Sequence, residues 1–178
     1  MPAQIARNII LVGLMGTGKS SLARILSRRT GALLIDTDVE IEKRESRKIA
    51  AIFAESGEAY FRTLETELLR EYQEKNGCII STGGGIVITE ENRRLLPDLG
   101  LVVWLHASLD VIFGRVSKNN HRPLLRTADP KSTLQELFEL REPWYREVAH
   151  LQVDTGENNR TEAVRLVLEA AGWQCKTA

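Results

Sequence analysis

The chain has few of the features that mark specialised classes of protein. Its 178 residues contain only two cysteines, Cys78 and Cys175, which lie far apart and lack the spacing of a metal site. Nothing therefore calls for an oxidising compartment, and we interpret the thiols as a small buried residue and a tail residue. The 24 basic and 24 acidic residues cancel, so bulk charge gives no reason to expect a nucleic acid or a membrane as partner.

Long apolar runs and linker-like stretches are also missing. The apolar segment IILVGLM at 9–15 follows Arg7 and could pass for the core of a signal peptide. It is too short to span a bilayer, however, and GTGKSS stands where a cleavage site would be. No repeat, low-complexity tract or Pro/Gly/Ser-rich linker divides the chain. We therefore expect one domain over residues 1–178 and a cytoplasmic protein.

Short apolar runs alternate with longer amphipathic segments, which is typical of a parallel sheet covered by helices on both faces. In such sheets ligands bind beyond the carboxyl ends of the strands. The pattern predicts an α/β fold. The expected strands are Asn8–Val12, Leu33–Ile35, Cys78–Ser81, Leu101–Leu105 and Leu151–Val153; the expected helices are Lys19–Arg29, Val39–Ala54, Ala59–Lys75, Glu90–Leu96, Leu109–Val116, Thr133–Val148 and Arg160–Ala171.

The segment GLMGTGKS at 13–20 fits the phosphate-binding pattern G-x-x-x-x-G-K-S/T at every fixed position, after a predicted strand and before a predicted helix. Its glycines allow backbone N–H groups to turn toward phosphate oxygens, and the helix N-terminus adds partial positive charge. In this pattern the lysine reaches the β- and γ-phosphates and the serine hydroxyl binds Mg²⁺. The predicted nucleotide-binding residues of this P-loop are Gly16, Thr17, Gly18, Lys19, Ser20 and Ser21, and Ser20 is a predicted metal ligand.

Two motifs that a GTPase switch requires, D-x-x-G and N-K-x-D, occur nowhere in the sequence. An ATP-dependent regulator or motor would carry partner surfaces or further domains, for which 178 residues leave little room. A small-molecule phosphotransferase is therefore the favoured class. An ATP-binding regulatory module without turnover stays open as an alternative.

Candidate acceptor-binding residues gather at the other predicted strand ends. Asp36 and Asp38 end an apolar run one residue apart, where two carboxylates repel each other unless ligands stand beside them. FRTLE places Arg62 and Glu65 on one face of a helix, although a solvated ion pair would give the same pattern. STGGGIV at 81–87 carries three consecutive glycines after a strand, which favours close approach of the backbone to a ligand over an ordinary loop.

The segment NNHRPLL at 119–125 combines polar residues, a proline and an apolar pair. We expect a lid at about 117–128 whose Arg122 enters the closing site, while a plain surface connector is the alternative. The three histidines show no metal-binding spacing.

The chain resembles the shikimate kinases over almost its whole length. The resemblance rests on six motifs in order: GLMGTGKS, DTD, FRTLE, TGGG, RPLL and LREPWYREVA at 140–149. Each later motif is weak alone, but their order and spacing are specific. The resemblance implies a P-loop nucleoside-monophosphate-kinase-like fold with a five-stranded parallel sheet flanked by helices. It also implies transfer of the γ-phosphate of ATP to the 3-hydroxyl of shikimate, a step toward chorismate and the aromatic amino acids. Gluconate kinases share the P-loop and the general fold and stay as the alternative enzyme.

The resemblance assigns roles to single residues of a substrate-binding helical region at about 37–75 and beyond it. Asp36 would hold Mg²⁺ through water, and Asp38 would bind shikimate hydroxyls near the attacking one. Arg62 and Arg141 would grip the substrate carboxylate, for which guanidinium groups are well shaped.

Further roles follow from the same resemblance. The backbone of Gly83, Gly84 and Gly85 would border the shikimate ring, and Glu65 would support the arginines. Arg122 would reach the transferring phosphate and Arg115 would lie against adenine, whereas the loop DTGENNR at 154–160 matches no adenine contact. The expected catalytic residues are Lys19, Asp38 and Arg122. The expected cofactors are ATP and Mg²⁺, and the expected assembly is a monomer.

Overall fold

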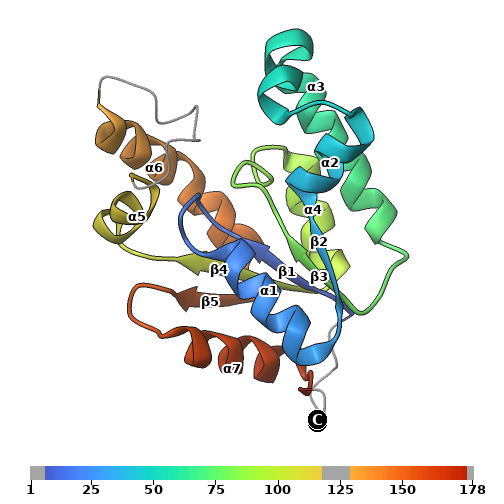
Figure 1. The fold of residues 1–178 in the computed structure, drawn as a ribbon, viewed down its shortest axis with the longest axis vertical. Coiled ribbons are helices and arrows are strands. Elements are labelled where there is room, and N and C mark those ends of the chain that lie inside the picture. The colour runs from blue at the N-terminus through green and yellow to red at the C-terminus, as the bar shows by residue number, and fades with distance from the viewer. Residues whose placement is uncertain (1–6, 118–128, 176–178) are drawn as a thin grey trace.

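The computed structural model describes residues 7–117 and 129–175, in which five parallel strands form one sheet in the order β2–β3–β1–β4–β5 (Figure 1). Each predicted strand is confirmed to within one residue at either end. The strands are β1 (Ile9–Val12), β2 (Leu33–Asp36), β3 (Cys78–Ser81), β4 (Leu101–His106) and β5 (Leu151–Asp154); the helices are α1 (Lys19–Thr30), α2 (Thr37–Glu45), α3 (Ile49–Tyr72), α4 (Glu90–Leu99), α5 (Leu109–Val116), α6 (Pro130–Val148) and α7 (Arg160–Ala171).

Helices cover both faces of the sheet, and the central strand β1 shows how. Ile9 and Leu11 pack with α1 and α7 on one face, whereas Ile10 and Val12 pack with α3 to α6 on the other. All four side chains are completely buried. Burial on both faces explains why the strands lack alternating polar residues.

Most helix ends follow local signals. α1 ends at Gly31, whose φ of 74° allows its N–H to donate to the Ser27 carbonyl. α6 begins earlier than predicted, at Pro130 rather than Thr133. Asp129 caps this helix by accepting a hydrogen bond from the N–H of Ser132 (3.1 Å), and proline suits the first helical position because it has no N–H to satisfy.

The prediction of one helix at Val39–Ala54 was wrong. α2 ends at Glu45, the next residue, Ser46, adopts a left-handed conformation with φ 53°, and α3 begins at Ile49. The break is stabilised because Glu42 Oε1 accepts a hydrogen bond from the Ile49 N–H (3.0 Å) at the start of α3. The predicted gap before residue 59 corresponds to a kink within α3 at Gly57, where φ is 83°.

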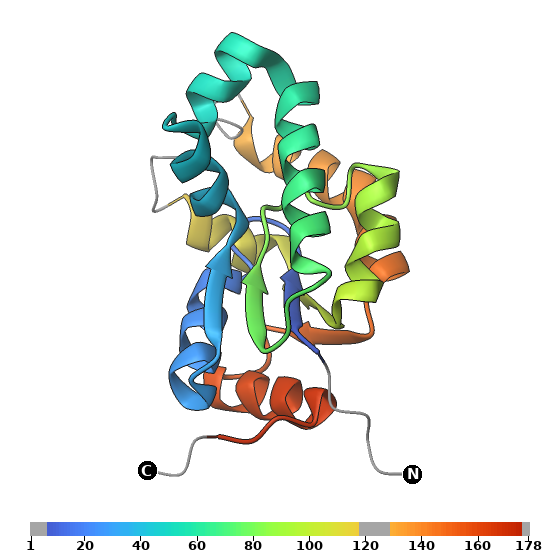
Figure 2. The same ribbon diagram turned by 90° about the vertical axis from the view of Figure 1, so that its right-hand side faces the viewer.

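The carboxyl ends of the parallel strands meet at one edge of the sheet, where a ligand site is expected. β1 leads into the P-loop, β2 ends at Asp36, and β3 leads into the glycine segment Gly83–Gly85. Figure 2 shows α2 and α3 extending beyond the ends of β2 and β3. Within the described ranges, no helix has the length and apolar character needed to cross a membrane.

Candidate active site

The P-loop depends on its glycines. Gly13, Gly16 and Gly18 have φ values of 139°, 80° and 96°, which residues with side chains rarely adopt. A Cβ added at Gly13 would overlap the carbonyl of Leu105, and one added at Gly16 would lie 2.6 Å from Val116 Cγ1. The tight turn and the close packing against α5 therefore both require glycine.

Lys19 and Ser20, the first residues of α1, present a cation and a hydroxyl at the helix N-terminus. The buried Lys19 Nζ donates to the carbonyls of Gly13 (2.7 Å) and Leu14 (3.0 Å), so the lysine crosses its own loop. Ser20 Oγ lies 3.5 Å from Asp36 Oδ2 at the end of β2. The predicted phosphate-binding and metal-binding residues are thus close together.

The far side of the P-loop is held by residues after β5. Arg115 donates through Nη1 to the Gly16 carbonyl (3.3 Å) and through Nη2 to the Thr155 carbonyl (2.6 Å). Thr155 in turn donates from Oγ1 to the carbonyl of Thr17 (2.8 Å). No motif identified Thr155, because its contact with the P-loop joins segments 138 positions apart. Ser21 is exposed on α1.

The two aspartates that end β2 have different environments. Asp36 caps α2, since its Oδ1 accepts a hydrogen bond from the N–H of Asp38 (3.2 Å). Asp38 Oδ1 is inaccessible to solvent and has no hydrogen-bond partner in the described part of the chain. Burial raises the pKa of Asp38 to about 6; the charge of Asp36 adds to this rise, whereas Lys19 and Arg62 oppose it.

Each of the three consecutive glycines lies against a different charged side chain. A Cβ at Gly83 would stand 2.5 Å from Asp38 Oδ1, and a Cβ at Gly85 would overlap the guanidinium of Arg62. Between them, the Gly84 carbonyl accepts hydrogen bonds from Arg141 Nη1 (3.3 Å) and from the Tyr145 hydroxyl. A side chain at Gly83 would thus displace the carboxylate of Asp38 and one at Gly85 the guanidinium of Arg62, whereas a Cβ at Gly84 would meet the P-loop backbone at 3.5 Å. The glycines come from the end of β3, and the three charged residues come from α2, α3 and α6.

Arg62 and Glu65 on α3 form a buried ion pair rather than a solvated one. Arg62 Nη1 lies 2.7 Å from Glu65 Oε2, and Arg62 Nη2 lies 2.7 Å from Glu58 Oε1. The Glu65 side chain is 0% exposed. Burial raises the pKa of Glu65 to about 7; Arg62 opposes this rise, and the nearby charge of Asp38 adds to it.

Four buried side-chain polar atoms have no hydrogen-bond partner in residues 7–117 and 129–175; one is Arg93 Nε, which lies 3.1 Å from Glu147 Oε2, and the other three belong to predicted site residues around the glycine segment. They are Asp38 Oδ1, Glu65 Oε1 and Arg141 Nε. Buried polar atoms are nearly always paired in folded proteins, so a group of such atoms indicates a ligand. Two acceptors and one cationic donor are suited to a small molecule that carries both hydroxyl and carboxylate groups.

Some predicted site residues are not tested by this geometry. Arg122 and the predicted lid after Ser117 fall outside the described residues. His106 Nδ1 lies 3.6 Å from Asp154 Oδ2, away from the glycine segment, and no three His, Cys, Asp or Glu residues of the described ranges form a metal-binding group.

Comparison with known proteins identifies the family. The family model for shikimate kinase matches residues 15–171. This chain belongs to the shikimate kinase family. The shikimate kinase of Bordetella avium is 46% identical over 90% of this chain and 77% of its own length. Membership makes the chain an ATP-dependent kinase, with the P-loop nucleoside-monophosphate-kinase-like fold of that family.

Solved structures agree with this membership. The shikimate kinase of Acinetobacter baumannii, solved in complex with shikimate, superposes with a TM-score of 0.85 at 36% identity and covers 92% of this chain and 91% of its own. A gluconokinase from Sinorhizobium meliloti reaches a TM-score of 0.63 at 18% identity over 95% of this chain and 93% of its own. The gluconokinase therefore shares the fold, whereas the shikimate kinases share both fold and sequence.

Proposed function

We propose that this chain transfers the γ-phosphate of ATP to the 3-hydroxyl of shikimate, giving ADP and shikimate 3-phosphate. The observation that carries the proposal is the set of three unpartnered atoms, Asp38 Oδ1, Glu65 Oε1 and Arg141 Nε, around a glycine backbone. The hydroxyl groups of shikimate can donate to the carboxylates of Asp38 and Glu65, and the carboxylate of shikimate can accept from the guanidinium of Arg141. Family membership supports the same substrate.

On the nucleotide side, the N-terminus of α1 and Lys19 supply positive charge for the phosphates of ATP. Lys19 Nζ is held by the carbonyls of Gly13 and Leu14. These bonds keep the ammonium group at the P-loop, and we propose that phosphate oxygens become its partners when ATP binds. We further propose that Gly16 to Ser21 surround the phosphates, while Arg115 lies against adenine.

One residue of α1 and the last residue of β2 fit Mg²⁺. Ser20 Oγ and Asp36 Oδ2 are hard oxygen donors 3.5 Å apart. Mg²⁺ keeps several waters and usually takes only one or two protein ligands together with phosphates, so a dedicated cluster of acidic residues is not required. We propose that Ser20 and Asp36 hold the ion, Asp36 through water. When bound, Mg²⁺ neutralises charge on the phosphate oxygens.

Asp38 is proposed to bind the attacking hydroxyl of shikimate. Its carboxylate lies beside Gly83, and its unpartnered Oδ1 can accept the hydroxyl proton. With a pKa of about 6, the group is mostly ionised at neutral pH yet basic enough to accept a proton. In the same position the carboxylate can also orient the attacking hydroxyl, and phosphoryl transfer depends chiefly on such positioning.

Arg62 and Arg141 are proposed to bind the substrate carboxylate together beside the glycine segment. They come from α3 and α6, and each contacts the glycine segment, Arg62 at Gly85 and Arg141 at Gly84. Glu65 holds Arg62 in place through its ion pair. A planar guanidinium suits a carboxylate because it can donate two parallel hydrogen bonds.

An ADP-release assay with three acceptors tests the proposal. ADP should form with ATP and shikimate, whereas gluconate and water alone should give only background. Release with gluconate would favour the alternative enzyme, and ATP binding without release would favour a regulatory module. The role of Arg122, the lid at about 117–128, the monomeric state and the cytoplasmic location stay predictions from the sequence.

A further inference from the structure

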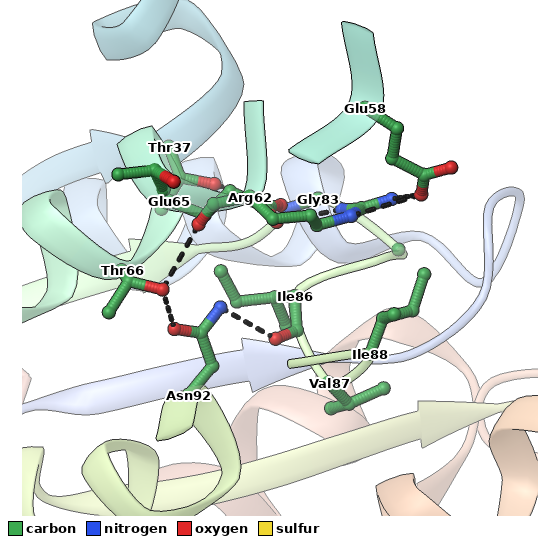
Figure 3. Close-up of polar contacts among 12 residues, drawn as sticks. Thr37, Glu58, Arg62, Glu65, Thr66, Gly83, Ile86, Val87, Ile88 and Asn92 are labelled. Atoms are coloured by element: carbon green, nitrogen blue, oxygen red, sulfur yellow. Dashed lines mark hydrogen bonds and ion pairs between the residues drawn. The ribbon is translucent and has the colours of Figure 1, made fainter. Parts of the chain in front are cut away.

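Three consecutive carbonyls after the glycine segment accept hydrogen bonds from two adjacent side chains of α4. Asn92 Nδ2 donates to the Ile86 carbonyl (3.0 Å), and Arg93 Nη1 donates to those of Val87 (2.8 Å) and Ile88 (3.0 Å). Figure 3 shows Asn92 reaching the backbone at Ile86. The first turn of α4 therefore holds the segment that follows the three glycines.

The other end of the Asn92 side chain contacts α3. Asn92 Oδ1 accepts a hydrogen bond from Thr66 Oγ1 (2.7 Å), and Asn92 is completely buried (Figure 3). Thr66 follows Glu65 directly, and its hydroxyl lies 3.0 Å from the carbonyl of Arg62. A single amide thus joins the glycine segment to the turn of α3 that carries the buried ion pair.

Arg93 makes the corresponding link to α6. Its Nε lies 3.1 Å from Glu147 Oε2, and its guanidinium carbon lies 5.1 Å from the centre of the Trp144 ring. Trp144 and Glu147 lie one and two turns beyond Arg141 on the same helix. Hence two neighbouring residues of α4 connect the glycine segment to both helices that carry the arginines.

The glycine segment needs such external support. It has no side chains to pack, and its bonds to other backbone groups are two turns, from the Ile86 N–H to the Gly83 carbonyl (3.2 Å) and from the Ile88 N–H to the Gly85 carbonyl (3.0 Å). Its remaining bonds are to side chains: Gly83 donates to Thr37, and Gly84 accepts from Arg141 and Tyr145. Glycine backbone is costly to order, so its position must be fixed by neighbouring groups. The bonds from Asn92 and Arg93 fix it relative to α3 and α6 together.

We propose that Asn92 and Arg93, with Thr66, are positioning residues that set the distance between Arg62 and Arg141 across the glycine backbone. This inference rests on the proposed function, in which both arginines bind the carboxylate of the acceptor. The three residues act through the groups they hold. Their loss should weaken acceptor binding and leave the P-loop unaffected.

Steady-state kinetics of Thr66→Val and Arg93→Met test the proposal. Valine keeps the shape of threonine and removes its hydroxyl, and methionine keeps an unbranched apolar stem and removes the donors. The KM for shikimate should rise about tenfold in each variant, because small displacements of binding groups have large effects, while the KM for ATP should stay within about twofold. Thr66→Ser keeps the hydroxyl and should restore the shikimate KM.

Matched controls come from the same helices. Thr63 on α3 is exposed and its hydroxyl donates to the Ala59 carbonyl, and Arg94 on α4 is exposed and pairs with Glu90. Thr63→Val and Arg94→Met should leave both KM values unchanged. Thermal unfolding of each variant shows whether it is folded at the assay temperature.

The outcomes separate positioning from general stability. A lower melting temperature with an unchanged shikimate KM in folded Thr66→Val and Arg93→Met would overturn the proposal, as would an equal rise in the KM for ATP. If one variant does not fold, the other decides. Wild-type protein that releases no ADP with shikimate would instead refute the proposed function itself.

Discussion

Asp38 Oδ1 lies so close to Gly83 that a Cβ added to this glycine would stand 2.5 Å from it. The N–H of Gly83 also donates to Thr37 Oγ1 (3.1 Å), the residue before Asp38. The end of β2 and the glycine segment are therefore fixed against each other at the carboxylate proposed to bind the attacking hydroxyl. A glycine here provides room for the acid rather than an unusual backbone conformation, because its φ is not positive.

Gly83→Ala should therefore reduce activity far more than stability. The new methyl group would displace the end of the Asp38 side chain, which can move, so the melting temperature should change little. Displacement of a reacting group by about 1 Å can lower kcat by roughly 100-fold. Gly114→Ala is the control, since no atom of the described residues outside its own helix backbone lies within 4 Å of a Cβ at Gly114. Near-normal kcat in Gly83→Ala would show that the position of Asp38 is not critical.

Asp38→Asn tests the acid itself. Asparagine keeps the size of the side chain and removes its charge and its basicity. Turnover should fall severely while the protein stays folded and binds ATP, because the P-loop does not depend on this side chain. Turnover and ATP binding are measured by ADP release and by calorimetry. Retention of most activity would exclude both proton acceptance and essential orientation by Asp38.

Arg141→Ala should weaken shikimate binding and leave ATP binding nearly intact. Loss of a hydrogen bond to a charged group costs about 1.5–3 kcal/mol, and more when the carboxylate stays desolvated. Calorimetry with each ligand separately measures the effect. Equal losses of affinity for ATP and shikimate would contradict the assignment of Arg141 to the acceptor.

The sequence predicted those parts of the fold and site that depend on local patterns. The P-loop needs a strand, glycines and a helix N-terminus in one short segment, so GLMGTGKS was sufficient to predict Lys19 and Ser20 beside a strand end. Parallel strands place their carboxyl ends together, which is why Asp36 was expected at the ligand-binding edge of the sheet, and the family resemblance placed it near the Mg²⁺ site; its carboxylate lies 3.5 Å from Ser20 Oγ. The break at Ser46 was missed because a left-handed serine has no strong sequence signal.

Contacts between distant segments could not be predicted in this way. Asn92 and Thr66 are 26 positions apart, and no sequence motif around either residue indicates that their side chains form a hydrogen bond. The sequence predicted that Arg62 and Glu65 share a helix face, but it did not predict that the pair is buried. Helical spacing determines which residues share a face and gives no information on which elements cover that face. Such features depend on packing of whole helices.

Burial of Glu65 should make the stability of the free protein depend on pH. Its pKa is raised from 4.5 to about 7 in the folded state, so the folded chain binds the proton more tightly than the unfolded chain does. The stabilisation is fully present below about pH 4.5 and is lost as pH rises through about 7. A shift of this size corresponds to roughly 3–4 kcal/mol at most.

Glu65→Gln removes this titration and keeps the shape of the side chain. The melting temperature of the variant relative to wild type should therefore increase between pH 5 and pH 8, because only the wild type must bury a negative charge at position 65 at the higher pH. Glu58→Gln is the control, since Glu58 also pairs with Arg62 but is largely exposed, and its difference from wild type should stay constant. Calorimetric unfolding of the three proteins across this range measures both differences. A Glu65→Gln difference that is independent of pH, or that decreases as pH rises, would mean that Arg62 keeps Glu65 fully ionised in the folded protein despite its burial.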